Sequence, residues 1–271
     1  MDGGLIVNEE GIKSAFAADG YAVVPGLLTG RQLGLAARLS RDLIERYRAG
    51  ERLVTRDAIS VADVTLRHPE RNPGVDAARW EAEPFIVGDL VARDVRFAQV
   101  IALPSLWKCT SFLLGCSLQD VVFHHSNLTR KPAGVGPAIG WHRDASNTYF
   151  STTDDKIVRF LLPLQLMSED NGGTALIPGS HEAPQGCSST DAIFPRVSPG
   201  SGLALHSQIL HGGYPNRGSE NRDVIVLQFG VASSTLAYQG NEILSLCHYS
   251  EIRNFCIRRW GNDCFTDYEE G

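Results

Sequence analysis

The chain has no long hydrophobic run and no excess of positive charge, and each absence excludes a class of protein. No apolar segment in its 271 residues approaches the length needed to cross a membrane. Acidic residues outnumber basic ones by 31 to 25, which gives a net charge of −6, and no basic stripe is interleaved with aromatic residues. Neither a membrane nor nucleic acid is therefore expected as a partner.

The cysteines lack the spacing of metal or redox motifs. The chain has six cysteines and no Cys-x-x-Cys pair, which argues against a zinc ribbon or a thioredoxin-type site. The first residues, MDGGLIVNEEGIKSAF, also lack the charged-then-apolar layout of a secretory signal. We expect a cytoplasmic protein whose cysteines are structural.

The remaining composition is that of one globular domain. A hydrophobic share of 43% with 21% charged residues is ordinary for a folded protein, and the length suits a single domain over residues 1–271. Its pattern predicts a helical part over about 1–118, a β core over about 119–235 and a C-terminal extension over 236–271. Residues 54–95 are less regular and predict a solvated loop, of a kind that sometimes covers a site.

Strand-like segments dominate the second half. Runs such as DKIVRFLLPLQLM and DVIVLQFGVA alternate with turns rich in Gly, Pro, Asn and Asp, which favours an antiparallel sandwich or barrel. The segment SGLALHSQILHGG predicts a strand that ends at His211. Near the start of the chain, Thr29 is expected to cap a long helix that stops at Gly50.

The stretch GWHRDASNTYF, residues 140–150, contains candidate metal ligands. Alternate residues of a strand face the same side, so His142 and Asp144 would present an imidazole and a carboxylate together. A second histidine would complete the two-His, one-carboxylate triad of non-haem Fe(II) oxygenases. His211 precedes a loop, as a ligand at the mouth of a barrel would, whereas the adjacent His124 and His125 would point to opposite faces of a strand. A His-x-Asp pair also occurs by chance, and then the two residues merely share a hydrogen bond.

An arginine follows His211 across a loop rich in Gly, Pro and Asn. A hairpin there would bring Arg222, at the head of an apolar strand, beside His211. A guanidinium binds a carboxylate through two parallel hydrogen bonds and keeps its charge when buried, so Arg222 would suit the far carboxylate of a 2-oxo acid. An arginine at the start of a buried strand is also common in structural ion pairs. The combination of His142, Asp144, His211 and Arg222 is the specific signal.

The chain resembles the phytanoyl-CoA dioxygenase family of Fe(II)- and 2-oxoglutarate-dependent oxygenases. The similarity lies in four segments in a fixed order: FAADGYAVVPGLL, WHRD, DNGGTALIPGSH and HGGYPNRGSENRDVIVLQF. The resemblance implies a mostly β protein in which N-terminal helices pack against a double-stranded β-helix, the jelly-roll or cupin-like core.

The resemblance also implies a site. It makes His142, Asp144 and His211 the Fe(II) ligands, with Arg222 on the distal carboxylate of 2-oxoglutarate, the cosubstrate used together with O2. Thr174 looks like the hydroxyl that some members place near the cosubstrate; it is equally well a plain strand residue after a Gly-Gly turn.

Three polar residues alternate along the segment SNLTRK. If one strand face points them inward, Asn127 and Lys131 would reach the other carboxylate of 2-oxoglutarate, with Thr129 between them. A polar strand face is also commonly solvated.

The resemblance implies hydroxylation, because members that halogenate have Gly or Ala in place of Asp144. 2-Oxoglutarate would be decarboxylated to succinate and CO₂ while an unactivated C–H bond of a small molecule is hydroxylated. Desaturation, epoxidation and ring closure stay open. Tailoring of natural products is the expected role, and a substrate tethered to a carrier protein is an alternative.

Two other hypotheses compete with the oxygenase. One is a non-catalytic jelly-roll protein that binds a small molecule, and the other is a different cupin-type metal enzyme, such as a zinc-dependent hydrolase or isomerase. Arg222 discriminates between them, because such an enzyme has no use for an anchor for a second carboxylate.

Overall fold

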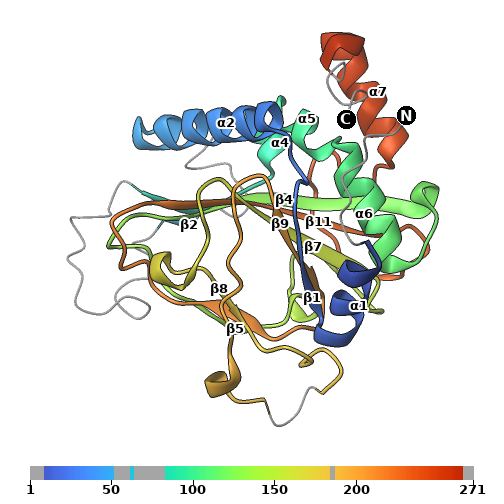
Figure 1. Ribbon diagram of the computed structural model, residues 1–271. Helices are drawn as coiled ribbons and strands as arrows, with labels where there is room; N and C mark the ends of the chain where they lie inside the picture. Colours follow the sequence, from blue (N-terminus) through green and yellow to red (C-terminus); the bar gives the residue numbers. More distant parts are fainter. Residues whose placement is uncertain (1–8, 52–61, 64–82, 184–186, 265–271) are drawn as a thin grey trace.

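Most strands form two β-sheets that face one another in a double-stranded β-helix (Figure 1). The structure is a computed structural model that describes residues 9–51, 62–63, 83–183 and 187–264. The mostly β jelly roll with N-terminal helices predicted from the sequence is confirmed.

The large sheet has seven strands in the order β1-β9-β7-β11-β4-β3-β2, and all its pairings are antiparallel. Its strands are β1 (Tyr21–Val24), β2 (Ala62–Asp63), β3 (Pro84–Gly88), β4 (Val121–Lys131), β7 (Ile157–Pro163), β9 (Gly202–His206) and β11 (Arg222–Val231). The small sheet, in the order β5-β10-β8, consists of β5 (Ile139–His142), β8 (Thr174–Leu176) and β10 (His211–Gly213). A two-stranded ribbon joins β6 (Ser151–Thr152) to β12 (Leu236–Tyr238).

Helices cover the face of the large sheet that points away from the small sheet (Figure 1). They are α1 (Glu9–Asp19), α2 (Gly30–Arg48), α4 (Leu90–Arg93), α5 (Phe97–Ile101), α6 (Pro104–Leu114) and α7 (Tyr249–Trp260). Trp107 of α6 packs edge-on against Phe229 of β11, with ring centroids 5.1 Å apart. Among the helices that the structure describes, none combines the length and apolar character needed to cross a membrane.

Alternation along β11 separates two hydrophobic cores. Ile225, Leu227 and Phe229 belong to the core between the large sheet and the helices, whereas Val224 and Val226 belong to the core between the two sheets. The polar residues of the same strand that share the inner face therefore point into the space between the sheets.

The long helix α2 begins and ends as its sequence predicts. The Thr29 side chain accepts a hydrogen bond from the backbone of Gln32, whose own side chain accepts from the Thr29 backbone, which makes a capping box. Gly50, with φ of +74°, follows the last turn and takes up the left-handed conformation that glycine tolerates best.

Two expectations about elements are wrong. SGLALHSQILHGG is not one strand ending at His211, because a turn over 207–210 carries the chain from β9 in the large sheet to β10 in the small one, and His211 begins β10. In the segment 54–95, the described residues 84–88 form strand β3, paired with β4, instead of a solvated loop. The rest of that loop prediction lies mostly outside the described residues.

Strand β4 contains a bulge at His124. Its register against β11 shifts between the pair His125–Gln228 and the pair Phe123–Phe229, so His124 is one residue extra. Both imidazoles consequently contact the same side chain: Gln228 Nε2 lies 3.1 Å from His124 Nδ1, and Gln228 Oε1 lies 3.1 Å from His125 Nε2. The expectation that these adjacent histidines point to opposite faces is therefore wrong.

Candidate active site

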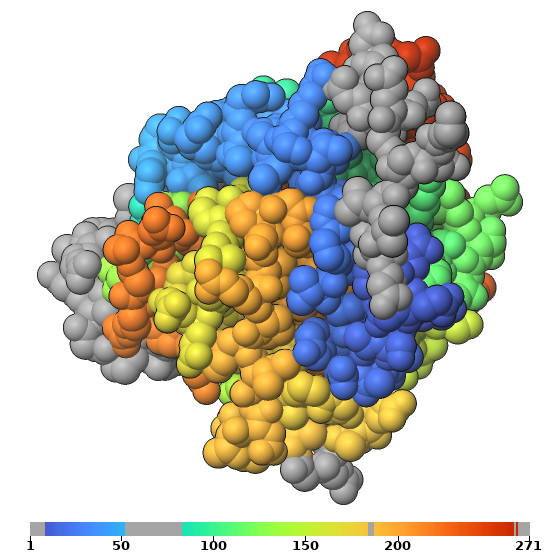
Figure 2. Space-filling view, in the orientation of Figure 1, coloured from blue at the N-terminus to red at the C-terminus, as the bar shows by residue number. Residues whose placement is uncertain are grey.

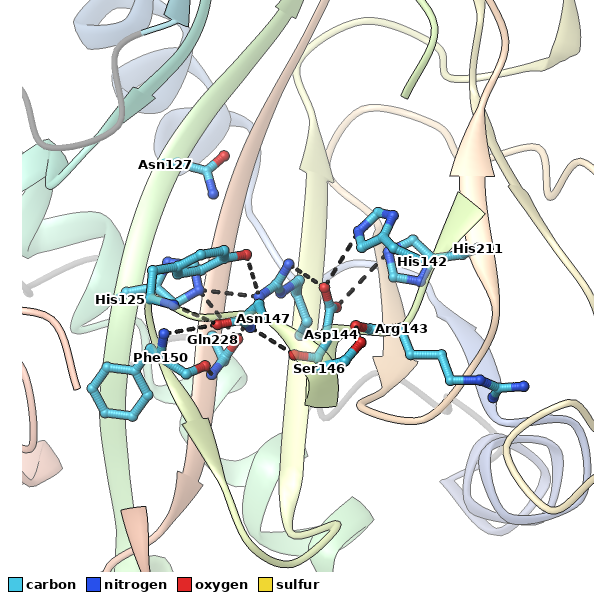
Figure 3. A network of polar contacts seen from close by, with 12 residues as sticks. His125, Asn127, His142, Arg143, Asp144, Ser146, Asn147, Phe150, His211 and Gln228 are labelled. Atoms are coloured by element: carbon cyan, nitrogen blue, oxygen red, sulfur yellow. Dashed lines mark hydrogen bonds and ion pairs between the residues drawn. The ribbon is translucent and has the colours of Figure 1, made fainter. Parts of the chain in front are cut away.

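Two histidines and an aspartate meet at one end of the small sheet (Figure 3). His142 is the last residue of β5 and His211 the first of β10, and the two are direct cross-strand partners with ring centroids 4.3 Å apart. Asp144 follows in a short 3-10 turn, η4 (Asp144–Ser146). One ligand atom from each of the three residues lies within 4.8 Å of the others.

Both imidazoles present the same nitrogen to this meeting point. His142 Nδ1 lies 2.8 Å from the carbonyl oxygen of Gly140, and His211 Nδ1 lies 3.1 Å from that of Ile209. A carbonyl can only accept, so each Nδ1 carries the proton and each Nε2 keeps a free lone pair. Burial lowers the pKa of His211 to about 4, which keeps this ring neutral at physiological pH.

The carboxylate of Asp144 is buried and only half satisfied. Oδ1 accepts a hydrogen bond from Arg159 Nη1 at 2.5 Å, whereas Oδ2 has no hydrogen-bond partner. Oδ1 lies 3.6 Å from His142 Nε2 and Oδ2 lies 3.8 Å from His211 Nε2. Burial acts to raise the pKa of Asp144, but Arg159 and the two imidazoles outweigh it and hold the pKa well below its usual range. A buried anionic oxygen without a donor, beside two free imidazole lone pairs, is the donor set that suits Fe(II).

Two buried cations face the triad from the large sheet. Arg222 and Lys131 are paired directly in the β11–β4 ladder and are 2% and 0% exposed. Lys131 Nζ donates to the carbonyl oxygens of Gly172 at 2.9 Å and Tyr214 at 2.5 Å. Burial and the neighbouring guanidinium lower the pKa of Lys131, and burial lowers that of Arg222 to about 10.

Neither cation is neutralised within the part of the chain that the structure describes. Arg222 Nε has no hydrogen-bond partner, and Arg222 Nη1 is 3.9 Å from the sulfur of Met167. The neighbouring Asp223 is bound by Arg130 at 2.8 Å. Because two uncompensated positive charges are costly in a buried place, the arrangement favours an anionic ligand between the sheets.

A cavity of about 120 Å³ connects these groups, and it lies between the two sheets. Six of the residues predicted for the site line this cavity: Asn127, Lys131, His142, Thr174, His211 and Arg222. Thr129 lines it too and donates from Oγ1 to Asn127 Oδ1 at 2.9 Å. Asp144, the remaining predicted residue, is in contact with both histidines at its edge. Asn127, Thr129 and Lys131 were expected on one inward strand face, and all three line this cavity.

Sequence reasoning missed a buried polar network next to the triad. Arg159 of β7 contacts Asp144, Gln228, Tyr149 and His125. The signal was present in the sequence, because an arginine inside the apolar run IVRFLLP can be buried only with partners.

Comparison with known proteins decides the family. The phytanoyl-CoA dioxygenase (PhyH) family model matches residues 16–224, which is most of the chain. The chain belongs to the phytanoyl-CoA dioxygenase family. The resemblance seen in the sequence is thereby confirmed, and Fe(II) and 2-oxoglutarate are the cofactors of this family.

Proteins similar to this PhyH-family chain include a dioxygenase. "Dioxygenase trt7" of Aspergillus terreus is 35% identical over 140 residues, which cover 48% of this chain and 49% of that protein. The match thus spans about half the length of the curated relative. In fold, the chain is similar to EctD from S. alaskensis, solved with 2-oxoglutarate and 5-hydroxyectoine, at 20% identity and a TM-score of 0.66, covering 88% of this chain and 81% of EctD.

A second solved structure shares the fold at a similar level. The epimerase SnoN, solved with Fe3+, alpha-ketoglutarate and nogalamycin RO, is 16% identical with a TM-score of 0.63, covering 86% of each chain.

Proposed function

We propose that this PhyH-family protein is an Fe(II)- and 2-oxoglutarate-dependent dioxygenase that hydroxylates an unactivated C–H bond of a small molecule. The observation that carries the proposal is the pairing of two incomplete sites across one cavity. A metal donor set with an unsatisfied carboxylate oxygen lies on the small sheet, and two unneutralised cations lie opposite on the large sheet.

In this proposal His142 Nε2, Asp144 Oδ2 and His211 Nε2 hold the iron. Their three positions leave the remaining coordination sites to 2-oxoglutarate and O2, as in other two-His, one-carboxylate centres. When bound, the iron supplies O2 activation coupled to decarboxylation of 2-oxoglutarate. The protein contributes two imidazole nitrogens with free lone pairs and the buried, charged carboxylate of Asp144.

Arg222 and Lys131 bind the distal carboxylate of 2-oxoglutarate, so that Lys131 binds the same carboxylate as its strand partner Arg222 and not the other one, as the sequence had suggested. Two cations on adjacent strands suit one carboxylate group. The guanidinium can form two parallel hydrogen bonds in a fixed orientation, and the ammonium adds a second positive charge. Thr174 and Asn127 line the same cavity and offer a hydroxyl and an amide for further hydrogen bonds to the cosubstrate.

The substrate is proposed to be a small natural product or metabolite, free or tethered to a carrier protein, and the site of action the cytoplasm. SnoN, whose structure holds nogalamycin RO, supports a natural-product substrate by its shared fold. The cavity of about 120 Å³ is smaller than the roughly 300–1,000 Å³ of pockets for drug-sized ligands, so it suits the cosubstrate. A larger substrate would occupy space beyond it.

One assay tests the proposal against its two alternatives. The purified protein, supplied with Fe(II) and 2-oxoglutarate under air, should form succinate slowly even without its substrate, and H211A should not. A non-catalytic binding protein would form none. A zinc-dependent enzyme would bind metal but not 2-oxoglutarate. Absence of 2-oxoglutarate binding to the anaerobic Fe(II) protein would contradict the proposal.

A further inference from the structure

Arg159, which is not one of the three metal ligands, contacts the carboxylate of Asp144. Arg159 sits in the middle of β7, is 5% exposed, and donates from Nη1 to Asp144 Oδ1 at 2.5 Å. The adjacent strand residues Val158 and Phe160 face the helices, so Arg159 points between the sheets. The Asp144 carboxylate is thereby held from the large sheet, although it belongs to the small-sheet side of the site.

The other half of the guanidinium is fixed by neutral groups. Arg159 Nη2 donates to Gln228 Oε1 at 2.5 Å and to the Tyr149 hydroxyl at 3.0 Å, and it lies 3.1 Å from His125 Nε2. Burial and the nearby Arg159 lower the pKa of His125, so this ring stays uncharged. Within the described residues, Asp144 is the carboxylate that Arg159 pairs with. A guanidinium that is hydrogen-bonded through both terminal nitrogens has little freedom to rotate.

We propose that Arg159 is a positioning residue that keeps Asp144 on the iron through Oδ2 alone. The inference rests on the proposed function. A carboxylate can bind a metal through one oxygen or through both. Binding through both would take one of the positions that 2-oxoglutarate and O2 need. Because Arg159 holds Oδ1 and nothing holds Oδ2, the carboxylate enters the site with one oxygen available.

Arg143 shows that nearness in sequence does not give this role. It directly precedes Asp144, yet its side chain points away from the triad (Figure 3). Its Nη1 donates to the backbone carbonyl oxygens of Ser180, at 2.7 Å, and of Gln208. Arg143 is therefore a matched control: the same residue type, next to the same ligand, without contact with its carboxylate.

The test compares Arg159→Met, Arg159→Lys and Arg143→Met with the unaltered protein. The affinity for 2-oxoglutarate is measured anaerobically from the visible absorption of the Fe(II) protein, and the Mn(II)-loaded proteins are crystallised to show how Asp144 binds. Substitution of residues that orient metal ligands typically costs about 10- to 100-fold in affinity or activity. We expect a loss of that size in 2-oxoglutarate affinity for R159M, a smaller loss for R159K and none for R143M.

The crystal structures give a readout that general loosening would not reproduce. We expect one-oxygen binding in the unaltered protein and in R143M, and a turned or two-oxygen carboxylate in R159M. Lysine keeps the charge but offers a single nitrogen in place of the two that contact Asp144 and Gln228, so R159K decides the question if R159M does not unfold cooperatively. Unchanged 2-oxoglutarate affinity with one-oxygen binding in a folded Arg159 variant would overturn the inference. So would two-oxygen binding in the unaltered protein. If the unaltered protein binds neither metal nor 2-oxoglutarate, the proposed function fails instead.

Discussion

Arg222 and Lys131 are direct partners in the β11–β4 ladder, so that a guanidinium and an ammonium lie side by side between the sheets. Both side chains are buried, and neither forms an ion pair with any residue that the structure describes. Like charges on paired strands repel, so the pair is best explained by a ligand of opposite charge.

Removal of either cation should weaken 2-oxoglutarate binding while leaving the metal in place. Hydrogen bonds to charged groups contribute about 1.5–3 kcal/mol, so R222Q and K131M should each lose roughly 10- to 100-fold in affinity for 2-oxoglutarate. R222K should lose less, because it keeps the charge and lacks only the fork. The measurement is anaerobic titration of the Fe(II) protein. Mn(II) affinity should stay unchanged, since the ligand atoms come from other residues, and a parallel loss of Mn(II) binding would contradict the assignment.

Affinity for 2-oxoglutarate should fall with rising pH. Burial and Arg222 lower the pKa of Lys131 well below its usual 10.5, so the free protein loses this proton earlier than an exposed lysine does. A dianion binds the protonated form better, so affinity decreases as the pH rises through the lowered pKa. Titrations from neutral to alkaline pH should show this decline in the unaltered protein. K131M should give a flatter profile, and an equally steep profile in K131M would assign the effect to another group.

A single methyl group should displace the ammonium without altering any charge. A Cβ on Gly213 would lie 2.8 Å from Lys131 Nζ, closer than such atoms approach in real proteins. G213A should therefore push Nζ aside and weaken 2-oxoglutarate binding, with little change in the free energy of unfolding, because Nζ is the far end of a flexible side chain. Gly34, on α2, has no atom within 4 Å of an added Cβ, so G34A is the control and should bind 2-oxoglutarate normally. Unchanged binding by G213A would show that the ammonium is not needed where it lies.

Stability should depend on the protonation of Glu242. Burial raises the pKa of this carboxyl from 4.5 to about 8 against the opposing effect of its hydrogen bonds from Ser126. Between these two pH values the folded chain holds a proton that the unfolded chain has lost, so stability falls as the pH rises toward about 8.

The variant E242Q mimics the protonated form. It should flatten this pH dependence and exceed the unaltered protein above neutral pH, by on the order of 2 kcal/mol in the free energy of unfolding. Thermal unfolding at several pH values measures this. Parallel curves for the two proteins would show that Glu242 is ionised throughout.

The metal triad and Arg222 are the parts of the site that the sequence predicts best. His142 and Asp144 are two residues apart, so they stay close, although Asp144 lies in the turn after β5 and not in the strand, as had been expected. The expected hairpin between His211 and Arg222 is wrong, because β10 and β11 belong to different sheets, and the two residues line the cavity from opposite sheets. The triad itself still needs the two sheets to fold. His211 reaches His142 because β10 pairs with β5, which no pattern within either strand reveals.

The partners of Arg159 and the bulge at His124 could not be predicted from the sequence for a different reason. In the pattern of β7, Arg159 is a break in an apolar run, and its partners come from β11 and from the turn after Asp144. The bulge depends on how β4 meets β11, which is a property of the pair of strands. Pro84–Gly88 was missed because a strand this short, between irregular segments, has too little pattern to stand out.

The bulge at His124 determines which side chains of β4 face the helices and which face the cavity between the sheets. Before it, Val121 and Phe123 pack towards the helices; after it, Leu128 does so, and Lys131 turns to the cavity. If β4 paired with β11 at its present length but without the bulge, one half of the strand would turn over, and either the Lys131 ammonium would enter the apolar layer or the Phe123 ring would enter the place of the ligand. The bulge therefore lets both halves of β4 keep their side chains in the correct layers.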